Sequence, residues 1–335
     1  MSTNREFVRR AAILPGDPSG IGYEITARAL SDTATRTALD AAGFVTLIYA
    51  NADLFERCAA CFAPGLRFCR IEDAGDAVSA DRLYLLDCGE VPSDFEPGTV
   101  RAACAAAAHA AIQRAIHDTC LGLVHGLCTG PIHKGAMRLA GIDAIGHTEM
   151  FARGFDVADP MTLFLTRELR IFFYTRHLSL RQAIDALDCE RLAVFASRAS
   201  GHLRQLGFAA PRLAMAALNP HAGDGCQFGD EEARILIPAA HLARERGIDI
   251  TDPIGADSVF AQAAAGRYDA VLSLYHDQGH IAAKTYDFDR TISATLGLPV
   301  LRTSVDHGTA LDIAWSGKAQ AVSMITALQA LARYA

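Results

Sequence analysis

The feature that most constrains the fold is the alternation of short apolar runs with longer segments of helical periodicity. Near the amino end, RRAAILPG is followed by GYEITARALSD and then by GFVTLIYAN. Apolar runs of this length are typical of buried strands, and helical segments between them are typical of the crossovers that join parallel strands. The segment 101–118, RAACAAAAHAAIQRAIHD, contains strong helix formers without internal glycine or proline, so we expect a helix there. The pattern predicts an α/β fold.

Length and composition place the chain among globular proteins. A chain of 335 residues with 51% hydrophobic and 21% charged residues can bury a large core and is typical of two domains. The net charge of -7 and the pI near 5.9 lack the basic excess that nucleic-acid binding needs. We therefore expect no nucleic-acid partner, and an anionic substrate requires local cations.

The sequence carries no sign of a membrane or of secretion. The apolar part of MSTNREFVRRAAILPGDPSG is too short for a signal peptide, and no stretch reaches the roughly 20 apolar residues of a membrane span. Nine scattered cysteines, an odd number without regular spacing, indicate a reducing compartment. We expect a soluble protein of the cytoplasm.

Four apolar runs end in polar clusters: LVHGLCTGPIHKG, LRIFFYTRHLS, RLAMAALNPHAGDG and DAVLSLYHDQGH. In open parallel sheets, ligands bind beyond the carboxyl ends of the strands, so polar side chains after separate strands can converge. His177, His221 and His276 occupy such positions. Three imidazoles suit a divalent transition ion, although each histidine alone also fits a helix cap or a core hydrogen bond. We leave out His280, because Gly279 and the preceding apolar run argue against an HxxxH helix.

Two other segments carry candidate anion-binding groups. LPGDPSGIGYEI places glycines between a strand and a helix, which fits either an anion site at the helix start or a purely structural turn. Arg302 in VLRTS can hold a phosphate or carboxylate through two parallel hydrogen bonds, and Lys284 can supply a point charge. Either residue equally fits a surface salt bridge.

A set of motifs along nearly the whole chain resembles one family. The motifs are GDPSGIGYEI, TGPIHKG, GHTEM, LNPHAGD, GADSVF, YHDQGH and TLGLPVLRTSVDHGTALDIA. They resemble the 4-hydroxythreonine-4-phosphate dehydrogenases of pyridoxal phosphate (pyridoxine) biosynthesis and their paralogues that act on other four-carbon acid phosphates. The stretch 307–314 also resembles isocitrate and isopropylmalate dehydrogenases. The resemblance implies two α/β/α lobes flanking a cleft, one of residues 1–140 with 296–335 and one of residues 141–295.

The resemblance also implies roles for individual residues. One divalent metal ion, Zn, Mg or Co, is expected on His177, His221 and His276. Substrate contacts are expected from His147, Thr148, Lys284, Ser293 and Arg302, with Lys284 and Asp257 as candidate catalytic residues. Contacts with NAD or NADP are expected from Gly297, His307, Gly308, Thr309 and Asp312.

Two positions depart from the family pattern. Ser293 stands in ISATLGLP where the family usually has Asn, and Trp315 replaces the Gly that is common after DIA. A hydroxyl has a shorter reach than an amide, so we expect a difference at the non-phosphate end of the substrate. His147, Thr148 and Arg302 are retained here, whereas their segments are altered in a family branch that acts on an aromatic dihydrodiol dicarboxylate. Their retention favours a phosphorylated substrate.

The expected reaction is a metal-dependent, NAD(P)-linked oxidation of the secondary alcohol of 4-phosphohydroxy-L-threonine, followed by decarboxylation to 3-amino-2-oxopropyl phosphate. The alternative substrate is 4-phospho-D-erythronate or 4-phospho-D-threonate. Alternatives of another class are a metal-dependent phosphatase or hydrolase that uses the three histidines and Asp277, and an inactive binding protein. The resemblance alone implies a homodimer whose active sites take residues from both subunits.

Overall fold

The computed structural model describes residues 8–143 and 146–335, and the chain divides into two compact units. Unit 1 comprises Met1–Pro160 and Thr295–Ala335, and unit 2 comprises Met161–Ala294. Residues 1–7 of the segment that we searched for a signal peptide lie outside the described residues. None of the helices in the described chain is long and apolar enough to cross a membrane.

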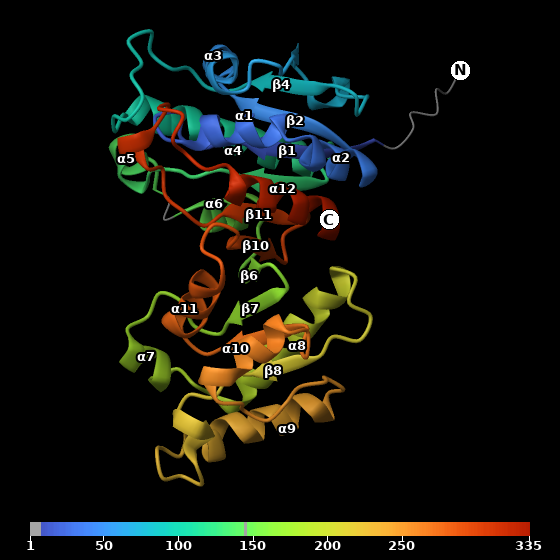
Figure 1. The fold of residues 1–335 in the computed structure, drawn as a ribbon, viewed down its shortest axis with the longest axis vertical. Coiled ribbons are helices and arrows are strands. Elements are labelled where there is room, and N and C mark those ends of the chain that lie inside the picture. Colours follow the sequence, from blue (N-terminus) through green and yellow to red (C-terminus); the bar gives the residue numbers. More distant parts are fainter. Residues whose placement is uncertain (1–7, 144–145) are drawn as a thin grey trace, which may run out of the picture. The chain divides into compact units, whose positions relative to one another are not determined.

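Unit 1 is built on parallel strands in the order β3-β4-β2-β1-β5-β11 (Figure 1). Ile13 of the central strand β1 lies opposite Ile48 of β2 and Cys128 of β5. The strands are β1 (Arg9–Leu14), β2 (Phe44–Ala50), β3 (Phe68–Ile71), β4 (Leu83–Asp87), β5 (Gly126–Thr129) and β11 (Arg302–Val305). Strands buried on both faces read as continuous apolar runs, which is why the alternation in the sequence identified them.

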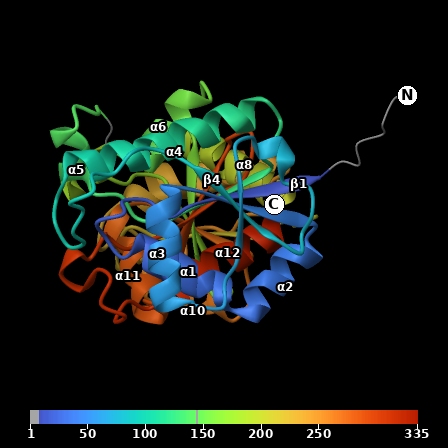
Figure 2. The ribbon, with the colours of Figure 1, turned by 90° about the horizontal axis from the view of Figure 1, so that it is seen from above.

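Helices cover both faces of the strands of unit 1. In Figure 2, α4, α5 and α6 lie along one side, and α1, α2 and α12 lie along the other. The helices are α1 (Gly22–Ser31), α2 (Thr33–Ala41), α3 (Ala52–Phe62), α4 (Ala102–Cys120), α5 (Lys134–Leu139), α6 (His147–Gly154) and α12 (Val322–Tyr334), with short 3₁₀ turns η1 (Ala74–Asp76) and η4 (Leu311–Ile313). The helix predicted over 101–118 is confirmed as α4. The α/β fold is confirmed as well.

Residues 141–160, which we expected in the second lobe, group with unit 1. The reason is α6, whose Met150 and Phe151 are buried in the same apolar cluster as Leu47 and Ile112. The chain returns to unit 1 through β10 (Ile292–Leu296), whose residues span the boundary between the two units.

Unit 2 contains the strand order β6-β7-β9-β8, with β6 and β7 antiparallel and the other pairs parallel. The strands are β6 (Met161–Thr166), β7 (Leu169–Phe173), β8 (Leu213–Met215) and β9 (Ala270–Ser273). Successive side chains of β7 point to opposite faces. Phe172 therefore packs on Phe195 of α8, whereas Ile171 and Phe173 lie against Gly279 of α11.

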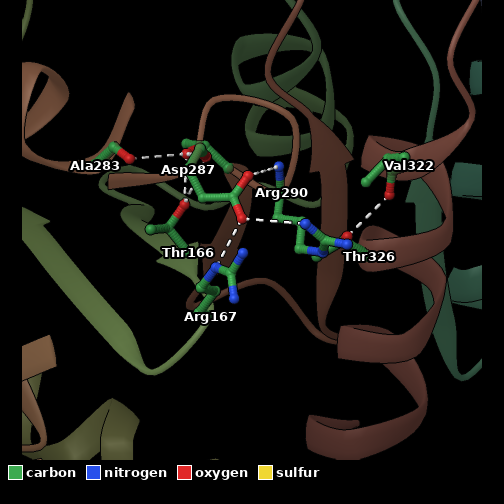
Figure 3. A network of polar contacts seen from close by, with 8 residues as sticks. Thr166, Arg167, Ala283, Asp287, Arg290, Val322 and Thr326 are labelled. Carbon is green, nitrogen blue, oxygen red and sulfur yellow. Dashed lines mark hydrogen bonds and ion pairs between the residues drawn. The ribbon is translucent and has the colours of Figure 1, made fainter. Parts of the chain in front are cut away.

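The helical elements of unit 2 lie on both sides of these strands. They are α7 (Leu180–Asp185), α8 (Cys189–Gln205), α9 (Ile237–Glu245), α10 (Ala256–Ala264) and α11 (His276–Tyr286), with a 3₁₀ turn η2 (Pro220–Gly223) and a π-turn η3 (Glu232–Leu236). Helices α10 and α11 cover the face that contains Ile171, and α8 covers the other face and contacts α9. The end of α11 is tied to the β6–β7 turn by Asp287, which lies between Arg167 and Arg290 (Figure 3).

Candidate active site

Arg302 on β11 is a buried cation that is held by hydroxyl groups. Its Nε and Nη2 atoms donate to Thr129 Oγ1 at 3.1 and 2.7 Å, and Nη1 donates to Thr295 Oγ1 at 2.9 Å. A longer contact of 3.4 Å joins Nη1 to Thr148 Oγ1, and the guanidinium lies 5.5 Å from the centre of the Phe151 ring. Arg302 is 4% exposed, yet no described carboxylate forms an ion pair with it. Among the described residues, Arg302 therefore does not form the surface salt bridge that the sequence left open as an alternative.

The electrostatics around Arg302 favour an anion. Burial lowers the pKa of Arg302 to about 10, because a buried charge without a counterion is costly. His147 is buried beside it, and burial together with the Arg302 charge holds the pKa of His147 well below its usual 6.5. The His147 ring is therefore neutral, and its Nε2 has no hydrogen-bond partner among the described residues. A phosphate would satisfy both groups at once.

Sequence reasoning missed Thr129 and Thr295, although both belong to motifs that the resemblance used. Thr129 ends β5 in TGPIHKG, and Thr295 lies in β10 in TLGLP. Both side chains are buried, so their hydroxyls need partners, and the Arg302 guanidinium supplies N–H donors. They position Arg302.

The three predicted metal ligands follow the carboxyl ends of three neighbouring parallel strands of unit 2. His177 follows β7, His276 follows β9 directly as the first residue of α11, and His221 follows β8 within η2. Strand β9 lies between β7 and β8, so the strand order brings the three chain segments to one edge. This is the edge at which open α/β sheets bind ligands.

Two of the three imidazoles are close together. The ring centroids of His177 and His276 lie 6.2 Å apart, and two imidazoles on one ion with metal–nitrogen bonds of about 2.0–2.1 Å have centroids roughly 5–6 Å apart. In the part of the chain that the structure describes, no three His, Cys, Asp or Glu side chains are grouped so as to hold a metal ion. The donor chemistry fits a transition ion, whereas a single described chain does not complete the site, so the metal site stays a prediction.

Two buried polar side chains, which sequence reasoning missed, hold the segments that carry His276 and His221. Gln278 accepts from Leu274 N at 2.8 Å and donates to Ala217 O at 2.7 Å, which ties the end of β9 to the end of β8. Glu232 accepts from the backbone N–H groups of Leu218 and Asn219 at 2.8 and 2.7 Å.

His221 has a left-handed backbone with φ 52°. For a residue other than glycine this costs on the order of 1–3 kcal/mol and is frequent at functional sites. Glu232 therefore holds a strained turn that presents His221.

His276 and His280 do form an HxxxH pair on a helix, so our prediction from the sequence was wrong on this point. Both lie on α11, and their rings are stacked with centroids 3.6 Å apart. Gly279 lies inside the helix, where a Cβ would lie 2.5 Å from Phe173 Cε1 and 2.9 Å from Ile171 Cγ2. The glycine permits the close approach of α11 to β7. Lys284 is one further helical turn along the same face, at spacing i+4 from His280.

The remaining predicted site residues of unit 2 are Asp257 and Ser293. Asp257 is exposed in the first turn of α10 and borders an apolar cavity of about 710 Å³ between α10 and α11, which is also lined by Phe260, Ile281 and Tyr286. Ser293 is half-buried on β10.

The predicted nucleotide segment lies in unit 1 against the glycine-rich loop that follows β1. Ile21 N donates to Thr309 O at 2.9 Å, and a Cβ on Gly20 would lie 2.7 Å from Thr309 Cβ. This contact supports the structural alternative for the glycines of that loop. Asp17 in the loop is buried, and burial raises the pKa of its carboxyl group. A buried acid at this point does not favour an anion there.

Within the predicted nucleotide segment, one ring nitrogen of His307 lacks a hydrogen-bond partner among the described residues. Its Nδ1 lies 3.0 Å from Gly308 O, whereas its buried Nε2 has no partner among the described residues. Asp312 is exposed on η4, and Gly297 is exposed in a turn with φ 86°. The orphaned Nε2 and the exposed carboxylate are polar groups to which a dinucleotide can bind.

Comparison with known proteins shows the family to which the chain is similar. The family model described as "Pyridoxal phosphate biosynthetic protein PdxA" matches residues 44–331. A protein of Symbiobacterium thermophilum named "Putative D-threonate 4-phosphate dehydrogenase" is 44% identical over 96% of both chains. A relative of the same name from Halalkalibacterium halodurans is also 44% identical, over 97% of this chain and 96% of its own.

Solved structures show the same similarity. The 4-hydroxythreonine-4-phosphate dehydrogenase of Klebsiella pneumoniae has a TM-score of 0.83 and 38% identity, with 97% of this chain and 98% of that chain covered. A terephthalate 1,2-cis-dihydrodiol dehydrogenase of Burkholderia xenovorans is less similar, with a TM-score of 0.65 and 26% identity over 97% and 98% of the chains.

Proposed function

The chain belongs to the PdxA family of pyridoxal phosphate biosynthetic proteins and is a dehydrogenase. From this we propose that it oxidises the secondary alcohol of a four-carbon hydroxy-acid 4-phosphate with NAD or NADP. The observation that carries this proposal is the buried Arg302, whose guanidinium contacts hydroxyl groups and whose neighbour His147 has an unsatisfied Nε2. A buried cation that forms no ion pair with a described residue, beside a neutral imidazole, is a site for a phosphate group.

Among four-carbon substrates, we favour D-threonate 4-phosphate, with 4-phosphohydroxy-L-threonine as the second candidate. The relatives at 44% identity have a name that refers to the former, and the structure at 38% identity has a name that refers to the latter. The two substrates differ at C2, where threonate has a hydroxyl and hydroxythreonine has an ammonium group. Ser293, in place of the expected Asn, suits a change at this non-phosphate end.

The proposed reaction is an oxidation at C3 followed by a decarboxylation. The C3 hydroxyl of the substrate loses its proton, and C3 transfers a hydride to the nicotinamide, which leaves a 3-oxo acid and NAD(P)H. The C1–C2 bond then breaks, because the ketone at C3 accepts its electron pair, and carbon dioxide leaves. Protonation at C2 gives dihydroxyacetone phosphate from D-threonate 4-phosphate, or 3-amino-2-oxopropyl phosphate from the hydroxythreonine compound.

Residues of this chain have separate roles in the proposal. Arg302, His147 and Thr148 hold the phosphate, and Lys284 and Asp257 are the candidates for proton transfer. His177, His221 and His276 would hold a divalent ion such as Zn, Mg or Co, which would supply Lewis-acid polarisation of the hydroxyl that is oxidised. Gly297, His307, Gly308, Thr309 and Asp312 would contact the dinucleotide.

A homodimer with shared active sites is part of the proposal. It is supported by apolar side chains on and just after α11 that a single chain leaves exposed: Ile281 by 64%, Tyr286 by 45% and Phe288 by 64%. Ile281 and Tyr286 also line the apolar cavity between α10 and α11. Apolar groups gathered in this way are typical of a surface that a partner covers, and His276 lies on the same helix.

The test is NAD(P)H formation across a panel of four-carbon acids, each offered with and without the 4-phosphate and with added divalent metals. We expect turnover only with acids that carry the 4-phosphate. Arg302→Ala should reduce kcat/KM for that acid about tenfold to hundredfold, because a charge-assisted hydrogen bond contributes about 1.5–3 kcal/mol. Arg302→Lys should restore part of the loss, since a point charge lacks the two-pronged geometry.

Two results would contradict the proposed dehydrogenase activity. One is equal turnover of phosphorylated and unphosphorylated acids by the wild type. The other is release of inorganic phosphate without reduction of nicotinamide, which is the outcome that a hydrolase based on the histidines and Asp277 predicts.

A further inference from the structure

Trp315, one of the two departures from the family pattern, has an unusual backbone and a defined set of contacts. Its φ is 57°, in the left-handed region that favours glycine. Its Nε1 donates to Pro18 O at 3.1 Å, and its ring centroid lies 5.6 Å from that of Phe95. A bulky side chain in a conformation that suits glycine must be held by contacts of this kind.

Arg57 of α3 completes the cluster. Its guanidinium carbon lies 5.3 Å from the centre of the Trp315 ring and 5.5 Å from that of Phe95, which is within the range of cation–π attraction. The nearest acidic residues along α3, Asp53 and Glu56, both pair with Arg70. No ion pair to Arg57 occurs within residues 8–143 and 146–335, and its side chain is exposed.

The cluster lies beside the predicted nucleotide segment within unit 1. Trp315 follows Asp312 and the turn η4 directly in the chain. Gly98, three residues after Phe95, donates its N–H to Ser19 O at 2.8 Å, and a Cβ at Gly98 would lie 2.9 Å from Leu311 O. The segments that carry Phe95, Trp315 and the glycine-rich loop therefore contact one another.

We infer that Trp315 and Arg57, which pack on the buried Phe95, form the adenosine end of the dinucleotide site, and that Arg57 selects the 2′-phosphate of NADP over the 2′-hydroxyl of NAD. The inference rests on the proposed function. The half-buried Trp315 ring can stack with an adenine ring, and the exposed Arg57 guanidinium, held against aromatic rings, is preorganised for a phosphate. An arginine near the ribose is a known way to accommodate the 2′-phosphate of NADP in dehydrogenases.

Direct binding tests this inference without turnover. Trp315 is the single tryptophan of the chain, so quenching of its fluorescence by NADPH and NADH reports binding at this position. Calorimetry gives the same dissociation constants independently. We expect NADPH to bind the wild type more tightly than NADH. Arg57→Met retains an apolar stem on the rings and should weaken NADPH about tenfold to hundredfold, with little effect on NADH.

Two further variants test the Trp315 ring separately from the Arg57 charge and provide a control. Trp315→Gly suits the left-handed backbone and should weaken both dinucleotides severalfold, as measured by calorimetry. Arg82→Ala is the matched control, since Arg82 is an exposed arginine of unit 1 at the opposite end of β4 from the segment with Phe95, and it should change neither constant.

The outcomes distinguish this inference from the proposed function. If the wild type binds neither NADPH nor NADH in the presence of a phosphorylated acid and a divalent metal, both fail. If it binds both and Arg57→Met leaves the ratio of the two dissociation constants unchanged, the inference fails and the dehydrogenase proposal stands.

Discussion

At the scale of single residues, the surroundings of Arg302 show how burial controls charge. The same loss of solvent lowers the pKa of Arg302 to about 10 and holds the pKa of His147 well below 6.5, with the nearby Arg302 charge as the second cause at His147. Arg302 is still cationic at neutral pH, whereas His147 is neutral and can act as either a donor or an acceptor toward a phosphate oxygen. The two groups are therefore complementary in function.

The neutral His147 predicts a pH dependence of stability. Its folded pKa is lowered, so between that value and the unfolded pKa of about 6.5 the unfolded state binds more protons, and the free energy of unfolding falls as pH falls. The slope from this residue can reach about 1.4 kcal/mol per pH unit. His147→Gln should reduce the slope measured by urea unfolding between pH 8 and 5.5, and His241→Gln, exposed on α9, should not. Identical slopes in wild type and His147→Gln would contradict the assignment.

The metal ligands predict a second result at this scale. His177→Ala, His221→Ala and His276→Ala should each abolish most turnover and reduce the bound metal, with circular dichroism that shows a folded protein, because each residue lies beyond a strand end rather than inside the core. Metal content measured by atomic emission, together with NAD(P)H formation, checks this. Near-normal activity and metal content in one variant would exclude that histidine from the site.

At the scale of elements, α11 carries the candidate chemistry of unit 2, and its contact with β7 sets its position. His276, His280 and Lys284 follow one another along its face, and Gly279 lets the helix approach Phe173 closely. Beyond its carboxyl end, Arg167 Nε donates to Asp287 at 2.7 Å. Hydrogen bonds from Arg290 and Arg167 hold the pKa of the Asp287 carboxyl below its usual value, although partial burial opposes them. Both ends of the helix are therefore fixed, which suits residues that must hold a defined geometry.

The packing of α11 on β7 predicts that alanine substitutions at two helical glycines change the free energy of unfolding differently. Gly279→Ala places a Cβ 2.5 Å from Phe173 Cε1, so we expect a loss of about 1–3 kcal/mol in the free energy of unfolding through overpacking. Gly201→Ala on α8 meets no atom within 4 Å and should be neutral or stabilising by up to about 1 kcal/mol. Urea unfolding of the two variants measures the difference. Equal stabilities would show that the close contact does not constrain α11.

At the scale of the whole molecule, one described chain brings His177 and His276 together but does not group three metal ligands. The shared active site that we propose would account for this, because a partner subunit would then supply the missing ligand. The exposed apolar residues Ile281 and Tyr286 on α11 suit a partner that covers this surface.

Shared sites predict complementation between two inactive variants. If His221 and His276 of one site come from different subunits, a mixed dimer of His221→Ala and His276→Ala has one intact site. Subunit exchange between equal amounts should then restore about a quarter of wild-type activity, because half of the dimers are mixed and each has one of two sites. The control is each variant carried alone through the same exchange. No recovery, with mixed dimers demonstrated by mass spectrometry, would contradict sharing of these two ligands.

The sequence by itself determined the α/β class, the helix α4 and the placement of His177, His221 and His276 after separate strands, because each follows from local periodicity and from the order of residues along the chain. It also indicated Arg302 as a candidate anion-binding residue, but left a surface salt bridge open as the alternative. Only the tertiary structure decided that Arg302 is buried among the hydroxyls of Thr129 and Thr295. Thr129 is distant from β11 along the chain, and Thr295 lies on β10, across a turn from it.

The same limit explains the error at Gly279 and the omission of Gln278 and Glu232. A glycine that permits close packing and a glycine that breaks a helix look alike until the facing strand, here with Phe173, is known. A buried glutamine or glutamate that holds a distant backbone segment has no local signature either. Periodicity reports which face of an element is buried, whereas only the folded chain shows which group that face meets.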